Sequence, residues 1–144
     1  MDLSEPQVMG ILNVTPDSFY AGSHGVTEGY IIDRIHQIMN EGASIIDIGA
    51  CSTRPGADEV SIEEEMSRLR MGLELIRKHR PDAIVSVDTY RADVAKMCVE
   101  EYGAAIINDI SAGQMDEQMF PTIARLGIPY IIMHMKGTPK DMQV

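Results

Sequence analysis

The sequence alternates short apolar runs with longer segments in which apolar residues recur every three or four positions. The short runs are largely continuous, which is typical of strands buried on both faces of a parallel sheet. These predicted strands cover residues 8–14, 44–49, 83–87, 105–107 and 130–134. The segments between them have helical spacing and cover residues 27–40, 61–80, 89–102 and 116–126. The pattern predicts an α/β fold of parallel strand–helix repeats.

Capping residues support these helix starts. Ser61 and Glu64 have the spacing of a capping box, and Thr27, Thr89 and Asp116 stand where they can cap the other three helices. We expect the second helix to bury one apolar face. That face would consist of Ile62, Met66, Leu69, Leu73 and Ile76.

Two architectures fit this order of elements. One is a five-stranded doubly wound sheet, and the other is a (β/α) barrel cut short. A complete eight-fold barrel takes about 250 residues, so the 144 residues here provide little more than half of one. In both architectures, ligands collect at the carboxyl ends of the parallel strands.

The composition is that of an ordinary soluble globular domain, with 44% apolar and 24% charged residues. The net charge of −10 argues against nucleic acid or an anionic membrane as a partner. No window contains the roughly 18 apolar residues of a membrane span, and the first residues lack a signal sequence. Two cysteines form no metal or disulfide pattern. We therefore expect a cytoplasmic protein.

Every predicted strand ends in polar residues. They are Asn13, the segment 47–54, Asp88, Asn108 with Asp109, and His134 with Lys136. A strand that only needed to stop could do so with a single Gly or Asn. Five successive polar ends predict one convergent binding site.

Residues 45–58 run from an apolar strand, with Asp47 inside it, into a loop rich in Gly and hydroxyl residues that contains Arg54. Glycine lets backbone N–H groups approach an anion, and arginine offers a planar fork of donors. The loop could hold a phosphate. Its composition also fits an ordinary polar connection.

The residue types at the strand ends restrict the chemistry. The sequence shows no Ser–His–Asp or Cys–His arrangement, zinc-ligand spacing, GxGxxG or P-loop. An Asp and an Asn can bind donors on a flat heterocycle, and the amide oxygen of Asn13 can complete a Mg²⁺ shell of water and phosphate. Cys51 is expected to be a small loop residue, and Cys98 a core residue. The set favours displacement of a phosphorylated leaving group.

Four segments resemble the successive signatures of dihydropteroate synthase, the folate-pathway enzyme that sulfonamides inhibit. They are M9-G-I-L-N-V-T-P-D-S-F19, I46-D-I-G-A-C-S-T-R-P-G56, S86-V-D-T-Y90 and N108-D-I-S111. The resemblance implies that residues 1–144 are the N-terminal part of a pterin-binding TIM barrel, its first four to five units. It also implies an enzyme that joins 4-aminobenzoate to (7,8-dihydropterin-6-yl)methyl diphosphate and releases diphosphate.

The resemblance assigns roles to individual residues. Asn13 would be the ligand of a Mg²⁺ ion that helps to hold diphosphate, and Thr53 and Arg54 would engage the diphosphate itself. Asp88 and Asn108 would hydrogen-bond the pterin ring. Arg54 and Asp88 would act in catalysis, the first by neutralising the leaving group and the second by favouring the electron-poor ring.

The resemblance also covers the second substrate and the order of events. Phe19 and Pro55 would help to form the aminobenzoate site. Diphosphate would leave first, and the arylamine would then attack a pterin-methyl cation.

The chain departs from the family pattern at two places. Ala50 and Cys51 stand where the family usually has Gly-Glu, which puts any role of that glutamate in doubt. The family's later pterin-binding and diphosphate-binding residues have no counterpart before Val144. The 144 residues are therefore expected to be inactive alone, and a half-barrel with open strand edges is expected to self-associate.

Two other functions remain alternatives. A methyltetrahydrofolate-dependent methyltransferase would share an Asp and an Asn that grip a pterin, but would not need the loops at residues 15–19 and 52–55. A receiver-like signalling domain would use Asp88 as phosphoacceptor and Lys136 as its partner. That chemistry needs an acidic pair after the first strand, where the chain has Asn13.

Overall fold

The fold is a single parallel sheet whose strands alternate with helices, as seen in a computed structural model that describes residues 4–15, 27–51 and 60–134. The elements are β1 Met9–Asn13, α1 Glu28–Asn40, β2 Ile45–Gly49, α2 Ile62–His79, β3 Ile84–Asp88, α3 Ala92–Tyr102, β4 Ile106–Asp109, α4 Met119–Leu126 and β5 Tyr130–Ile132. All nine fall on the segments predicted from the hydrophobic pattern.

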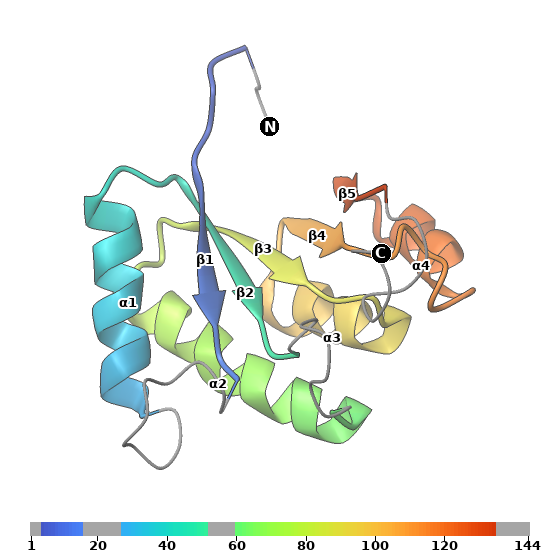
Figure 1. The fold of residues 1–144 in the computed structure, drawn as a ribbon, viewed down its shortest axis with the longest axis horizontal. Coiled ribbons are helices and arrows are strands. Elements are labelled where there is room, and N and C mark those ends of the chain that lie inside the picture. The colour runs from blue at the N-terminus through green and yellow to red at the C-terminus, as the bar shows by residue number, and fades with distance from the viewer. Residues whose placement is uncertain (1–3, 16–26, 52–59, 135–144) are drawn as a thin grey trace, which may run out of the picture.

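The order of the strands separates the two predicted architectures. The sheet runs β1-β2-β3-β4-β5 with every neighbouring pair parallel. A doubly wound sheet reverses its strand order at one point, and this sheet does not. The four helices pack in chain order along one side of the curved sheet (Figure 1). This is the arrangement of consecutive units of a TIM barrel, so the doubly wound alternative is wrong.

The two faces of the sheet have different compositions because side chains alternate along each strand. The face toward the helices carries the aliphatic core. It includes Leu12, Val14, Ile46, Ile48, Val87 and Ile107, all at most 1% exposed. The opposite face carries polar residues near the carboxyl ends of the strands. Packing against the helices therefore fixes which side chains the sheet presents on its other side.

Small residues let the helices lie close to the sheet. A Cβ added at Gly10 would be 2.3 Å from Cγ2 of Ile38, and one added at Gly72 would be 2.4 Å from Cδ1 of Ile48. Both distances are below any real Cβ contact, so a larger residue at either position would force its isoleucine neighbour to move. Within the described ranges, no helix has the length and apolar character needed to cross a membrane.

The capping predictions are confirmed for α1 and α2. The Thr27 hydroxyl accepts a hydrogen bond from the Tyr30 N–H, and the Ser61 hydroxyl accepts one from the Glu64 N–H. The expected inward face of α2 is wrong at its start. Ile62 is 40% exposed, while Glu65 is 1% exposed, because Glu65 has partners in the interior.

The cap predicted for the third helix is wrong, since α3 begins three residues after Thr89. The Thr89 hydroxyl instead donates to Glu65. The Ala92 N–H at the start of α3 is bound by Oδ2 of Asp116, at 2.7 Å. The other oxygen of Asp116 accepts from the Gln118 N–H, just before α4 begins. One carboxylate therefore joins the starts of two successive helices.

Candidate functional site

A row of laterally paired residues crosses the carboxyl ends of all five strands. The strand register places Asn13 beside Gly49, Gly49 beside Asp88, Asp88 beside Asn108, and Asn108 beside Ile131. Side chains at paired positions of parallel strands point to the same face. The register therefore brings together Asn13, Asp88 and Asn108, which the sequence predicted as site residues.

Gly49 leaves room between the polar side chains on either side of it. A Cβ at this position would lie 3.4 Å from Oδ2 of Asp88 and 3.7 Å from Oδ1 of Asn13. Both side chains therefore reach over the glycine. A larger residue at 49 would compete with them for this space.

A second row lies one step deeper on the same face. It pairs Ile11, Asp47, Ser86 and Ile106. Asp47 is 5% exposed, and its Oδ2 accepts a hydrogen bond from Nδ2 of Asn108 at 3.0 Å. Oδ1 of Asp47 and Oγ of Ser86 are buried, and neither has a hydrogen-bond partner in the part of the chain that the structure describes. The two rows are thus linked through Asn108.

The site concentrates negative charge around Asp88. Burial, and then the carboxylates of Asp47, Glu65 and Asp109, raise the pKa of Asp88 from 3.8 to about 7. A carboxyl group with this pKa exists in both protonation states near neutral pH. Perturbed groups of this kind are enriched at functional sites.

A buried network supports the segment that follows Asp88. Oε1 of Glu65 accepts from the Thr89 hydroxyl at 2.7 Å, and Oε2 accepts from Nη1 of Arg91 at 2.6 Å. Nη2 of Arg91 donates to the Val60 carbonyl at 2.7 Å. Sequence reasoning missed Glu65 because it ends a run of three glutamates in the first turn of a helix, where exposed acids are common.

Asp109 was predicted to join the convergent site, but the strand alternation turns it to the helix side. It is fully buried there and accepts from the Ser111 N–H, the Gly113 N–H and the Tyr130 hydroxyl. These bonds organise the loop after β4. Asp109 acts on Asp88 only through its charge.

The two cysteines match their predicted structural roles. Burial and the neighbouring Glu65 raise the pKa of the Cys51 thiol to about 12, so it stays protonated and weakly nucleophilic. Cys98 is fully buried in the core beneath α3. The Glu65 carboxylate beside Cys51 also forms a hydrogen bond with its thiol, and this bond raises the pKa of the thiol further instead of activating it.

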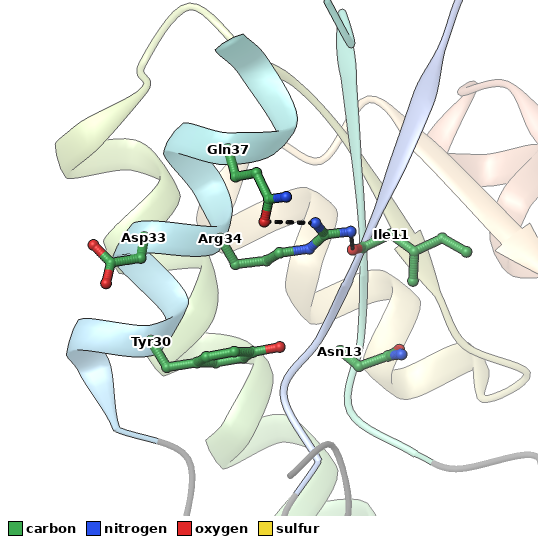
Figure 2. Close-up of a pocket in the computed structure, with 6 residues that line it drawn as sticks. All are labelled: Ile11, Asn13, Tyr30, Asp33, Arg34 and Gln37. Carbon is green, nitrogen blue, oxygen red and sulfur yellow. Dashed lines mark hydrogen bonds between the residues drawn. The ribbon is translucent and has the colours of Figure 1, made fainter. Parts of the chain in front are cut away.

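A pocket lies beside the row, between α1 and the free edge of β1 (Figure 2). Arg34 reaches across it, donating to the Ile11 carbonyl at 3.4 Å and to Oε1 of Gln37 at 2.9 Å. The carboxamide of Asn13 points away from α1 in this view. Its Oδ1 and Oδ2 of Asp88 lie 3.7 and 3.4 Å from the position that a Cβ at Gly49 would occupy. Asn13 is thus where this edge pocket meets the strand-end row.

Of the remaining predicted site residues, His134 is exposed just after β5, and five others lie outside the described ranges. They are Phe19, Thr53, Arg54, Pro55 and Lys136. Their assigned positions in the site stay predictions.

Comparison with known proteins gives a consistent picture. The family model described as pterin binding enzyme matches residues 9–144. Dihydropteroate synthase from Escherichia coli is 46% identical over 146 residues, which cover 99% of this chain and 50% of that protein. The folic acid synthesis protein fol1 of Schizosaccharomyces pombe is 48% identical over 135 residues, 94% of this chain and 18% of that protein.

Solved structures agree with this result. Yersinia pestis dihydropteroate synthase, in a complex with a sulfonamide drug, superposes with a TM-score of 0.86 at 44% identity. The match covers 99% of this chain and 51% of that one. The chain thus spans about half the length of the dihydropteroate synthases it matches.

These relatives also bear on the alternatives. Their names come from folate synthesis and support neither a methyltransferase nor a receiver-like domain. The match covers nearly all of the chain and includes each strand end in the polar row. The chain belongs to the pterin binding enzyme family.

Proposed function

We propose that the natural gene product containing this chain is a dihydropteroate synthase. It would condense (7,8-dihydropterin-6-yl)methyl diphosphate with 4-aminobenzoate, in folate biosynthesis. The observation that carries the proposal is the row of Asn13, Asp88 and Asn108 at adjacent strand ends, each within a segment that resembles this enzyme. The named relatives, several of them dihydropteroate synthases, support it.

In this proposal Asp88 and Asn108 bind the pterin ring. Both lie at the carboxyl ends of central strands, where backbone hydrogen bonds on both sides hold them in place. The carboxylate form of Asp88 accepts from ring N–H groups and stabilises positive charge that develops on the ring as diphosphate leaves. Ligand N–H donors favour that ionised form, so binding draws the proton off Asp88.

The residues present fit a Mg²⁺ site at Asn13. The Asn13 side chain is exposed at the strand end, and the described residues contain no cluster of three His, Cys, Asp or Glu that could form an all-protein cage. Mg²⁺ prefers one or two protein oxygens plus water and phosphate. Oδ1 of Asn13 would supply the protein ligand, and the ion, when bound, neutralises the diphosphate.

The remaining residue roles rest on the resemblance. Thr53 and Arg54 would engage diphosphate, with Arg54 stabilising the leaving group, and Phe19 and Pro55 would border 4-aminobenzoate. A sulfonamide would be expected to bind the enzyme, as a sulfonamide drug binds the Yersinia pestis relative. The free cysteines fit a reducing, cytoplasmic location. The open edges of β1 and β5 favour self-association of the 144 residues when they are produced alone.

A turnover assay tests the proposal. The natural gene product is mixed with both substrates and Mg²⁺, and dihydropteroate and diphosphate are measured. We expect both products in equal amounts, and we expect Asp88→Ala to lower kcat/KM by roughly a hundredfold or more. Asp93→Ala, a change of the same residue type on the exposed surface of α3, is the control and should retain activity. Absence of product would reject the function, and an active Asp88→Ala variant would reject the role of Asp88.

A further inference from the structure

The contact between Asn108 and Asp47 determines which end of the Asn108 carboxamide faces the site. A carboxamide has a donor end and an acceptor end, whereas a carboxylate only accepts. Asp47 therefore binds the NH₂ end of Asn108, at 3.0 Å. The carbonyl oxygen of Asn108 is left on the other side, and it remains available to a ligand above the row.

Asp47 is well placed to hold this orientation. It is 95% buried, and its strand is paired on both sides in the middle of the β1–β3 region. Turning the Asn108 amide over would place two acceptor oxygens against each other and leave the NH₂ group without its charged partner. Charge-assisted hydrogen bonds are among the stronger ones in proteins, so the orientation is strongly biased.

The second carboxylate oxygen of Asp47 lies beneath the floor of the site. Oδ1 of Asp47 is buried and has no partner among the described residues, although unpaired buried oxygens are costly. Because that oxygen is buried beneath the outer row, the acceptors that the floor of the site presents to a ligand are the Asp88 carboxylate and the carbonyl oxygen of Asn108. A ligand that satisfies them carries several N–H donors along one edge.

We propose that Asp47 is a positioning residue that sets ligand specificity by locking the Asn108 carboxamide with its oxygen toward the ligand. This proposal rests on the proposed function and names the part of the substrate that is recognised. The floor selects the ring edge of a 2-amino-4-oxopteridine, where an amino group and a ring N–H lie side by side. An oxygen in place of the amino group would meet acceptors and be rejected.

Asp47→Asn tests the proposal because it keeps the shape and changes only the hydrogen bonding. An amide at position 47 can donate to the Asn108 oxygen, which frees the Asn108 amide to turn over and present its NH₂ group. We would measure Kd by calorimetry for two probes, 6-hydroxymethylpterin and 6-hydroxymethyllumazine, the analogue with oxygen at position 2. The protein is the natural gene product.

The wild-type protein should prefer the pterin by roughly tenfold or more, and Asp47→Asn should lose most of that ratio. Ser86→Ala is the matched control. It removes the other buried polar atom of the deeper row that has no partner among the described residues, and it leaves the Asn108 contact intact, so the ratio should stay. The double variant Asp47→Asn with Asn108→Asp again places an amide donor against a carboxylate, so it should recover the preference for the pterin. A variant that had lost its fold could not show this recovery.

The outcomes separate this inference from the proposed function. Pterin preference that is unchanged in a folded Asp47→Asn variant would overturn the inference alone. If Asp47→Asn does not fold, the double variant decides, and its failure to prefer the pterin would overturn the inference. A wild-type protein that binds neither probe would overturn both the proposed function and the inference.

Discussion

Glu65 is a polar residue whose replacement should strongly destabilise the described part of the chain. Its side chain is 1% exposed, and each carboxylate oxygen accepts one short hydrogen bond, from Thr89 and from Arg91. The Arg91 side chain is itself only 12% exposed. Glu65→Ala would leave a nearly buried guanidinium facing a cavity, and would remove the acceptor for the Thr89 hydroxyl.

The size of the effect follows from the burial of both partners. Removing one member of a buried ion pair costs roughly 3–5 kcal/mol, because the remaining charge stays desolvated. Glu64→Ala provides a matched control one residue away. Glu64 pairs with Arg68 across one helical turn, but its side chain is 54% exposed, and such pairs contribute about 0.3–0.5 kcal/mol. The two neighbouring glutamates should therefore differ by at least about 2 kcal/mol.

Urea denaturation of the natural gene product, followed by circular dichroism, would measure both changes in the free energy of unfolding. The values can be compared only if the free energy of unfolding falls with urea concentration at the same slope in the wild type and in both variants. A loss below about 1 kcal/mol for Glu65→Ala would show that water or rearranged side chains satisfy Arg91, contrary to our reasoning. Because Thr89 follows Asp88 directly, we also expect this variant to lose more activity than Glu64→Ala.

Two further changes test the packing and the electrostatics of the site. Gly72→Ala should lower the free energy of unfolding by about 1–3 kcal/mol, because its methyl group would lie 2.4 Å from Ile48, although alanine normally favours a helix. Gly29→Ala in α1 is the control and should not destabilise, since the nearest neighbour of its methyl group would be 3.9 Å away. Equal urea midpoints for the two variants would contradict this reasoning. Asp88→Asn should stabilise the ligand-free protein increasingly as pH rises from 3.8 to about 7. The native wild type holds the proton of the Asp88 carboxyl group more tightly than the unfolded state does, so the wild type loses stability over that pH range. Parallel curves of stability against pH for the two proteins would show that the pKa of Asp88 is not raised.

Much of the fold could be predicted from the sequence because its signals are local. Continuous apolar strands, three- and four-residue spacing and hydroxyl caps all place elements without knowledge of distant contacts. The prediction that Thr89 caps a helix was wrong, because its hydroxyl binds Glu65, which lies 24 residues away in the sequence. Strand order was also out of reach, since the same local pattern fits both a doubly wound sheet and a barrel.

The candidate site also contains some residues that the sequence could predict and others that it could not. Asn13, Asp88 and Asn108 could be found because strand ends in a parallel sheet meet at one edge, whatever the strand order. The role of Asp47 could not, because it depends on a contact with Asn108 that spans 61 residues. The separation of Asn108 from Asp109 likewise depends on strand register, which decides that neighbours in sequence face opposite sides of the sheet.

The distribution of charge connects the described floor to the proposed reaction. The carboxylates of Asp47 and Asp88 lie on the same face of the sheet, where they would repel a diphosphate and attract a ring that carries N–H donors. An anionic leaving group must therefore be held away from the floor, at the Asn13 side and by cationic groups that these strands do not supply. In the proposed reaction, the departure of the anion would leave a cationic ring above the carboxylates, which would stabilise its charge. The acidic floor thus fixes the ring and favours the separation of charge that the proposed chemistry requires.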